Sequence, residues 1–156
     1  MSKELVVNLR NLHNKQKLFI ESPSKRKVVR AGRRGGKTVG AAMLALMGFL
    51  EGSRVLYAAP TEDQIGSFWH EIKRSLSEPI DAKLYTKNET MHYVELAGTK
   101  QRIRAKTAYN ADTLRGDYAN ILILDEFQLM NEDTWALVGA PMMLDTNGDA
   151  IFIYTP

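Results

Sequence analysis

Short apolar runs alternate along the chain with longer segments of helical character. Runs rich in β-branched residues predict strands, and they occupy residues 27–31, 54–58, 121–124 and 150–154. Longer segments predict helices at 38–50, at about 60–76 and at 132–140, with a short helix within 3–19. Strands that alternate with helices are typical of an α/β fold with a doubly wound, mostly parallel sheet.

Two of the predicted segments refine this picture. Residues 91–96 and 101–106 flank Ala97-Gly98-Thr99-Lys100, a pattern typical of a hairpin turn, so we expect an antiparallel addition at one edge of the sheet. Residues 121–124 are apolar on both faces, which indicates a central strand of the parallel part. The sequence therefore predicts a three-layer α/β domain that spans residues 1–156.

Composition agrees with one folded domain. The chain has 156 residues, of which 44% are hydrophobic and 25% charged, as in ordinary globular proteins. It contains no cysteine, which excludes disulfides and zinc–thiolate sites. No apolar run reaches the roughly 18 residues of a membrane span, and charged residues from Lys3 onward interrupt any leader. We expect an intracellular protein without a membrane partner.

The charge is distributed unevenly along the chain. The net charge is +3, but residues 1–40 carry a net +9 and residues 41–156 a net −6. A basic N-terminal quarter indicates an anionic partner, either nucleic acid or nucleotide phosphates. The alternative at this point is a solvated basic face.

A phosphate-binding loop lies between the first predicted strand and the next helix. Its sequence is Ala31-Gly32-Arg33-Arg34-Gly35-Gly36-Lys37-Thr38, a Walker A pattern in the strand–loop–helix context that such a loop requires. We expect the loop backbone to surround phosphates at the start of the helix. Lys37 is predicted to reach the β- and γ-phosphates, and the Thr38 hydroxyl to bind Mg²⁺. Ala31 is a departure, because the pattern has glycine there.

Two arginines, Arg33 and Arg34, lie inside this loop. One of them could contact the γ-phosphate and stabilise the charge of the transition state, and we favour Arg33 for that catalytic role. The alternative is that both face solvent or DNA.

An acidic pair follows the central strand. Asp125 and Glu126 come directly after four apolar residues, which is a Walker B pattern. The first carboxylate is expected to hold Mg²⁺, and the second to activate the water that attacks the γ-phosphate.

Weaker signals lie near both ends of the chain and before the acidic pair. Gln16 precedes the loop strand, and its amide could read the edge of an adenine. Thr155 ends the last strand, where a hydroxyl could sense the γ-phosphate. The segment Arg115-Gly116-Asp117 is interpreted only as a turn.

Taken together, these motifs resemble the ATPase domain of the large terminase subunit of tailed phages. The resemblance covers nearly the whole chain. It rests on Gln16, residues 32–38, Val55-Leu56-Tyr57-Ala58-Ala59-Pro60-Thr61 with Gln64, Asp112-Thr113-Leu114-Arg115-Gly116, Asp125-Glu126 and Tyr154-Thr155-Pro156. Phe127 departs from the family, in which a small residue is common after the acidic pair.

The resemblance implies a RecA-like P-loop NTPase fold of the ASCE class that uses ATP and Mg²⁺. The resemblance also implies a role for each motif residue. Nucleotide is bound by Gln16, Gly32, Arg33, Arg34, Gly35, Gly36, Lys37 and Thr38, and the metal by Thr38 and Asp125. Glu126 is the catalytic carboxylate, and Thr155 couples hydrolysis to movement.

The same resemblance implies partners for the motor. These are double-stranded DNA, further copies of the chain in a ring, a portal protein and a small terminase subunit, all in the host cytoplasm. Nothing in the sequence corresponds to the family's nuclease domain, so the domain looks like part of a longer enzyme. Two alternatives remain: the first domain of a superfamily 2 helicase, which has the same motif order, and a nucleotide- or DNA-binding module without turnover.

Overall fold

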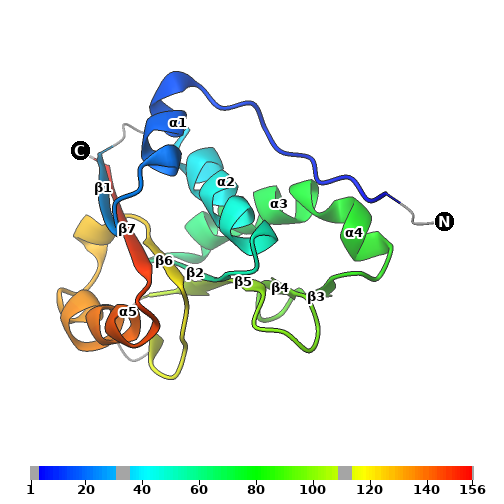
Figure 1. Cartoon of the computed structure of the whole chain (residues 1–156). Helices are drawn as coiled ribbons and strands as arrows, with labels where there is room; N and C mark the ends of the chain where they lie inside the picture. The colour runs from blue at the N-terminus through cyan, green and yellow to red at the C-terminus, as the bar shows by residue number, and fades with distance from the viewer. Residues whose placement is uncertain (1–3, 31–35, 109–113, 156) are drawn as a thin grey trace.

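The computed structural model describes residues 4–30, 36–108 and 114–155, and it shows helices on both faces of a seven-stranded sheet (Figure 1). The strands are β1 (Arg26–Arg30), β2 (Arg54–Ala59), β3 (Thr86–Asn88), β4 (Tyr93–Glu95), β5 (Arg102–Thr107), β6 (Ile121–Leu124) and β7 (Asp149–Tyr154). The helices are α1 (Asn14–Glu21), α2 (Lys37–Leu50), α3 (Glu62–Ser75), α4 (Ser77–Asp81), the 3₁₀ turn η2 (Phe127–Leu129), the π-helix η3 (Thr134–Gly139) and α5 (Ala140–Thr146).

The strand order is β1-β7-β6-β2-β5-β4-β3, and the first five strands run parallel. This arrangement confirms the mostly parallel sheet. The predicted hairpin is confirmed as the antiparallel pair β4–β5, in which Val94 faces Ile103. However, β5 also pairs in parallel with β2, so it lies inside the sheet, and β3 forms the edge.

Two apolar clusters hold the layers together. Helices α2 and α3 cover one face of the sheet, where Tyr57 and Ile123 are buried. Helix α2 is buried on most sides, which explains why all of its residues after Thr38 are apolar or glycine. On the other face, Leu122 and Leu124 pack against Val138 and the methionines of α5. In the described part of the chain, no helix has the length and apolar character needed to cross a membrane.

Three elements differ from the sequence-based expectation. The helix predicted at 132–140 is a π-helix at 134–139 that continues as α5 to Thr146. Pro141 lies at the junction of the two segments, where the hydrogen-bond pattern changes from the π-helix to the α-helix. Helix α4 and strand β3 were not predicted, because they have only five and three residues and no apolar periodicity.

Candidate active site

Four polar side chains from three separate parts of the sequence meet at one end of the parallel sheet. Lys37 begins α2, Asp125 and Glu126 follow β6, and Thr155 follows β7. Strands β6 and β7 are parallel neighbours, so their carboxyl ends lie at the same edge of the sheet, where α/β proteins bind ligands.

The ammonium group of Lys37 contacts all three of the other residues. Its Nζ donates to Glu126 Oε1 and to Thr155 Oγ1, the latter at 2.8 Å. It lies 3.3 Å from Asp125 Oδ1. The Lys37 side chain is 13% exposed and that of Glu126 is 11% exposed, so the charges interact in a partly desolvated environment in which the attraction is stronger than in water.

Glu126 is held from several sides. The Thr155 hydroxyl donates to its Oε1 at 2.6 Å, and the Gln128 amide donates to its Oε2. Its backbone has a φ of +51°, a left-handed conformation that is uncommon outside glycine. This conformation turns the chain sharply after β6 into η2, so that the carboxylate points back towards Lys37.

Asp125 is fixed more tightly, because only 1% of the residue is exposed. The hydroxyl of Tyr57 donates to Oδ2 at 2.5 Å, and the backbone N–H of Glu126 donates to Oδ1 at 2.8 Å. The Tyr57 ring stacks on Phe68 with 3.9 Å between centroids. Burial raises the pKa of Tyr57, and the negative charge of Asp125 raises it further. Tyr57 is therefore a permanent hydrogen-bond donor to this carboxylate.

The oxygen donors at this end of the sheet fit a magnesium site of the kind found in nucleotide enzymes. Thr38 follows Lys37 in the first turn of α2, and the Asp125 carboxylate accepts two hydrogen bonds and faces one ammonium, which leaves acceptor capacity for a water ligand. Within the described residues, no three His, Asp or Glu side chains cluster as an all-protein metal cage. Mg²⁺ needs no such cage, because it takes one or two protein oxygens together with waters and phosphates.

Gln16 lies next to the predicted phosphate loop, as the sequence suggested. It is 5% exposed, and its Nε2 donates to the carbonyl of Gly36 at 2.8 Å. Its Oε1 accepts from the backbone N–H of His13 in a capping box at the start of α1. Gly36 has a φ of +70°, and a Cβ there would lie 2.5 Å from Gln16 Nε2. The structure thus gives Gln16 a positioning contact to the loop, while its contact with adenine stays a prediction.

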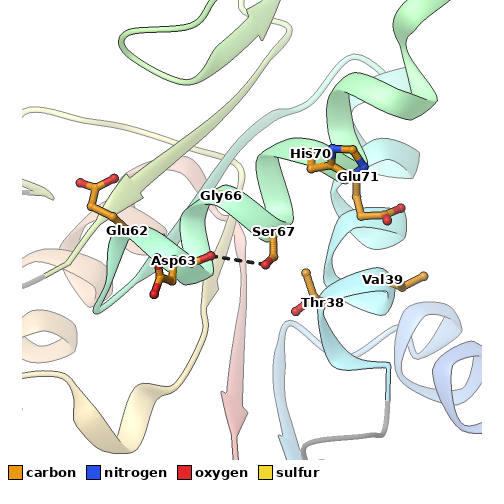
Figure 2. Close-up of a pocket in the computed structure, with 8 residues that line it drawn as sticks. All are labelled: Thr38, Val39, Glu62, Asp63, Gly66, Ser67, His70 and Glu71. Atoms are coloured by element: carbon orange, nitrogen blue, oxygen red, sulfur yellow. Dashed lines mark hydrogen bonds between the residues drawn. The ribbon is translucent and has the colours of Figure 1, made fainter.

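The other predicted loop residues, Gly32, Arg33, Arg34 and Gly35, lie outside the described residues, as does Ala31. Thr38 lies at the mouth of a groove of about 630 Å³ between α2 and α3 (Figure 2). Glu62 and Asp63 line the α3 side of this groove, and Figure 2 shows Thr38 and Val39 on the α2 side.

The sequence-based reasoning missed two residues that contact the site, Tyr57 and Gln128, and one ion pair outside it, that of Asp117. A signal existed for Tyr57, which carries the only polar side-chain atom among the five buried residues of strand β2, and such an atom needs a partner. Nothing in the sequence pattern indicated a role for Gln128. Asp117, interpreted only as part of a turn, accepts from Arg104 at 3.1 Å and Lys106 at 2.7 Å.

Comparisons with known proteins identify the family of this chain. The family model described as "Terminase large subunit, ATPase domain" matches residues 23–156. A large terminase subunit of Thermus phage G20c is 29% identical over 163 residues, which cover 92% of this chain and 33% of that protein. The chain thus spans about a third of the length of that relative.

Two solved structures share the fold. The large terminase ATPase domain of Thermus phage P74-26 superimposes with a TM-score of 0.79 at 24% identity, covering 94% of this chain and 65% of that one. The large terminase of a thermophilic bacteriophage, solved in complex with ADP, gives a TM-score of 0.63 at 18% identity, covering 92% of this chain and 38% of that one. The RecA-like fold expected from the sequence is confirmed.

Proposed function

The chain belongs to the family of terminase large-subunit ATPase domains, and we propose that its site hydrolyses ATP with Mg²⁺ to drive DNA packaging. The observation that carries the proposal is the meeting of Lys37, Asp125, Glu126 and Thr155 at one end of the sheet. A binding module without turnover has no need of a second carboxylate placed beside the phosphate-binding lysine. The family match also favours packaging over unwinding by a superfamily 2 helicase.

Lys37 is proposed to bind the β- and γ-phosphates. Its Nζ contacts Glu126 and Thr155, so phosphate binding requires the ammonium to exchange carboxylate oxygens for phosphate oxygens. The exchange frees Glu126 to accept a proton from water, and it makes the position of Glu126 depend on bound nucleotide. Gly36 and the predicted loop residues Gly32, Arg33, Arg34 and Gly35 would supply backbone donors and positive charge around the same phosphates.

Thr38 and Asp125 are proposed to hold the magnesium, which when bound offsets the negative charge of the phosphates. Asp125 is suited to this role because Tyr57 and the backbone N–H of Glu126 fix its carboxylate. The ADP bound to the large terminase of the thermophilic bacteriophage supports nucleotide binding in this fold.

Glu126 is proposed as the general base of hydrolysis. It would accept the proton of the attacking water and thereby increase the nucleophilicity of that water towards the γ-phosphorus. Gln128 holds the carboxylate from the side opposite Lys37 and Thr155, through Oε2 rather than Oε1. Thr155 is proposed to transmit the change at Glu126 to β7 and so to couple hydrolysis to movement.

The further proposed roles are those of a whole large terminase subunit. A large terminase subunit works with other terminase subunits. We propose that the whole protein moves double-stranded DNA into a procapsid in the host cytoplasm, as a homo-oligomeric ring on a portal protein with a small terminase subunit. The family match and the basic N-terminal quarter support this proposal. Residues 1–156 would act as its ATPase domain, without nuclease activity.

Two substitutions test the proposal. Glu126→Gln should bind a labelled ATP analogue as wild type does and lower kcat by at least about 100-fold, because the amide keeps the shape and loses the base. Lys37→Ala should instead lower the affinity by roughly 10- to 100-fold, since it removes the charge-assisted hydrogen bonds to phosphate.

Glu51→Gln serves as a control for the same chemical change at an exposed position beyond the far end of α2, and it should leave nucleotide affinity and kcat within about threefold. If Glu126→Gln hydrolyses ATP as fast as wild type, another residue must be the general base. A strand-displacement assay with the wild-type protein distinguishes packaging from unwinding, and ATP-dependent displacement of a strand would favour the helicase.

A further inference from the structure

Strand β5 carries a row of partly exposed cations on one face of the sheet. Ile103 and Ala105 point into the core beneath α2 and α3, so the alternate positions Arg102, Arg104 and Lys106 face the opposite side. Arg54 on β2 is in register with Arg102 and joins them on that side. We call these four residues the basic sheet face.

The basic sheet face lies beyond the second apolar cluster. On β2 that cluster includes Leu56 and Ala58, which are in register with Arg104 and Lys106, and directly after β5 it includes Ala108. Figure 1 shows α2, α3 and α4 above this half of the sheet, whereas α5 lies below the half formed by β6 and β7. Cations therefore occupy the places on β5 where a covering helix would need apolar side chains.

Placing these charges together costs stability. Like charges on neighbouring strands repel each other. Burial lowers the pKa of Arg102, and the charges of Arg54 and Arg104 lower it further. The Nε atoms of Arg102 and Arg104 are buried without a hydrogen-bond partner, which is itself unfavourable. An anion bound on this face would relieve the repulsion between the charges.

The protein offsets only part of this positive charge. Glu95 on β4 is in register with Arg102, and its charge raises the pKa of Arg102 against the effects of burial and of the neighbouring arginines. Asp117 accepts from Arg104 and Lys106, which accounts for two of the four cations. Among the residues that the structure describes, Arg54 and Arg102 make no ion pair within 4 Å and instead stack on aromatic rings. The Arg54 guanidinium lies 4.3 Å from the centre of the Tyr118 ring, and that of Arg102 lies 4.1 Å from the centre of the Tyr93 ring.

Stacking orients the two guanidinium groups without neutralising their charge, which at Arg102 is offset only in part by Glu95. A planar guanidinium donates two parallel hydrogen bonds to phosphate oxygens, a geometry that lysine lacks. The cations along β5 are spaced about 6.6 Å apart, twice the rise per residue of a strand. A row of fixed, evenly spaced cations suits a polymer with regularly repeated anions.

We propose that the basic sheet face binds the phosphate backbone of double-stranded DNA, independently of base sequence. This inference rests on the proposed function as a packaging motor, which has to hold DNA of any sequence and therefore uses phosphate rather than base contacts. DNA is favoured over an acidic peptide because the face offers repeated cations and no apolar pocket for peptide side chains.

The test compares three forms of the chain for binding to a fluorescently labelled DNA duplex of random sequence. The first is wild type, the second is Arg54→Gln/Arg102→Gln, and the third is Lys25→Gln/Lys83→Gln, which removes the same charge from two exposed positions outside this face. Fluorescence anisotropy at several salt concentrations gives the affinity and its salt dependence. Binding of a labelled ATP analogue is measured in parallel.

We expect the arginine variant to bind DNA roughly tenfold more weakly at physiological salt. Its slope of log affinity against log salt should be smaller by about 2, since each phosphate contact contributes about 0.9. The lysine control should reduce this slope by less than half of the reduction expected for the arginine variant. Both variants should bind the ATP analogue as wild type does, because no substituted residue touches Lys37, Asp125, Glu126 or Thr155. The arginine variant should fold, since it removes repulsion, and its melting temperature checks this.

Equal losses in the arginine and lysine variants would overturn the proposal, as would wild type that binds no DNA. Polyglutamate that displaces the duplex from wild type at equal charge concentration, but not from the arginine variant, would identify an acidic peptide as the occupant instead. Should the double variant be unstable, Arg102→Gln alone is expected to reduce the slope by about 1. An intact DNA affinity in a protein without ATPase activity would overturn the proposed function and leave this inference standing.

Discussion

Lys37 and Thr155 stand 118 residues apart in the sequence, yet the Lys37 Nζ lies 2.8 Å from the Thr155 hydroxyl. The same hydroxyl donates to Glu126 at 2.6 Å. Thr155 thus bridges the residue proposed to bind phosphate and the residue proposed to activate water. We therefore expect a shift of Lys37 on nucleotide binding to change the hydrogen bonds of Thr155 at the end of β7.

Replacing Thr155 tests this bridge. Thr155→Val keeps the shape of the side chain and removes the hydroxyl, so we expect kcat to fall by about tenfold or more while the Kd for an ATP analogue changes less than about threefold. Thr155→Ser keeps the hydroxyl and should retain most of the activity. Steady-state turnover and equilibrium binding are measured on all three proteins. A serine variant as impaired as the valine variant would mean that the methyl group, rather than the hydroxyl, matters.

Tyr57→Phe tests the support of Asp125. The substitution removes the hydrogen bond to a buried carboxylate but keeps the ring that stacks on Phe68. A hydrogen bond to a charged group contributes about 1.5–3 kcal/mol, so Asp125 should become less well positioned for the metal. We expect the Mg²⁺ concentration for half-maximal ATPase activity to rise by roughly three- to tenfold. Leu56→Ile is the control, because the neighbouring Leu56 packs in the apolar cluster on the opposite face of the sheet. It should leave the Mg²⁺ concentration for half-maximal activity unchanged.

Gly36→Ala tests the contact between α1 and the phosphate loop. The new Cβ would collide with Gln16 Nε2, and φ is positive, so we expect a loss of about 2–3 kcal/mol from strain and from the broken hydrogen bond. Gly52 also has a positive φ but has no atom within 4 Å of an added Cβ. Gly52→Ala should therefore show the strain alone, about 1–2 kcal/mol.

Chemical denaturation gives these free energies of unfolding. In a Gln16→Ala background, Gly36→Ala should cost no more than Gly52→Ala, because the colliding amide is gone. A Gly36→Ala cost that stays the same with and without Gln16 would show that the two residues are not coupled.

The pH dependence of stability tests the anchor of the N-terminal segment. Arg10 donates to Glu71 at 2.7 and 2.9 Å, and this hydrogen bond holds the pKa of Glu71 below its ordinary value, against the opposing effect of burial. A lowered pKa in the folded state stabilises the protein above the unfolded pKa of about 4.3. That contribution disappears as the pH falls through the folded pKa.

Arg10→Gln should therefore lower the melting temperature by about 2–4 °C at pH 7. The difference from wild type should be unchanged at pH 6 and should shrink as the pH falls below about 4.3. Thermal melts of both proteins across this range provide the measurement. A difference that stays constant to the lowest pH would assign the effect of Arg10 to packing rather than to the charge of Glu71.

Some features of the molecule follow from short stretches of sequence. The apolar run before Asp125, the glycine-rich approach to Lys37 and the turn at Ala97–Lys100 each specify a local structure, and the structure has a strand, a helix and a hairpin at these places. Local patterns succeed here because strand, helix start and tight turn depend on backbone preferences and side chains within a few residues.

The site itself depended on more than local patterns. The order β1-β7-β6-β2-β5 places the ends of β6 and β7 side by side, and only that order brings Thr155 to Lys37 and Tyr57 to Asp125. The sequence by itself determined which residue types were available for phosphate chemistry. The tertiary structure decided which of them touch, because contacts between residues 68 and 118 positions apart arise from strand pairing and packing, which no local periodicity encodes.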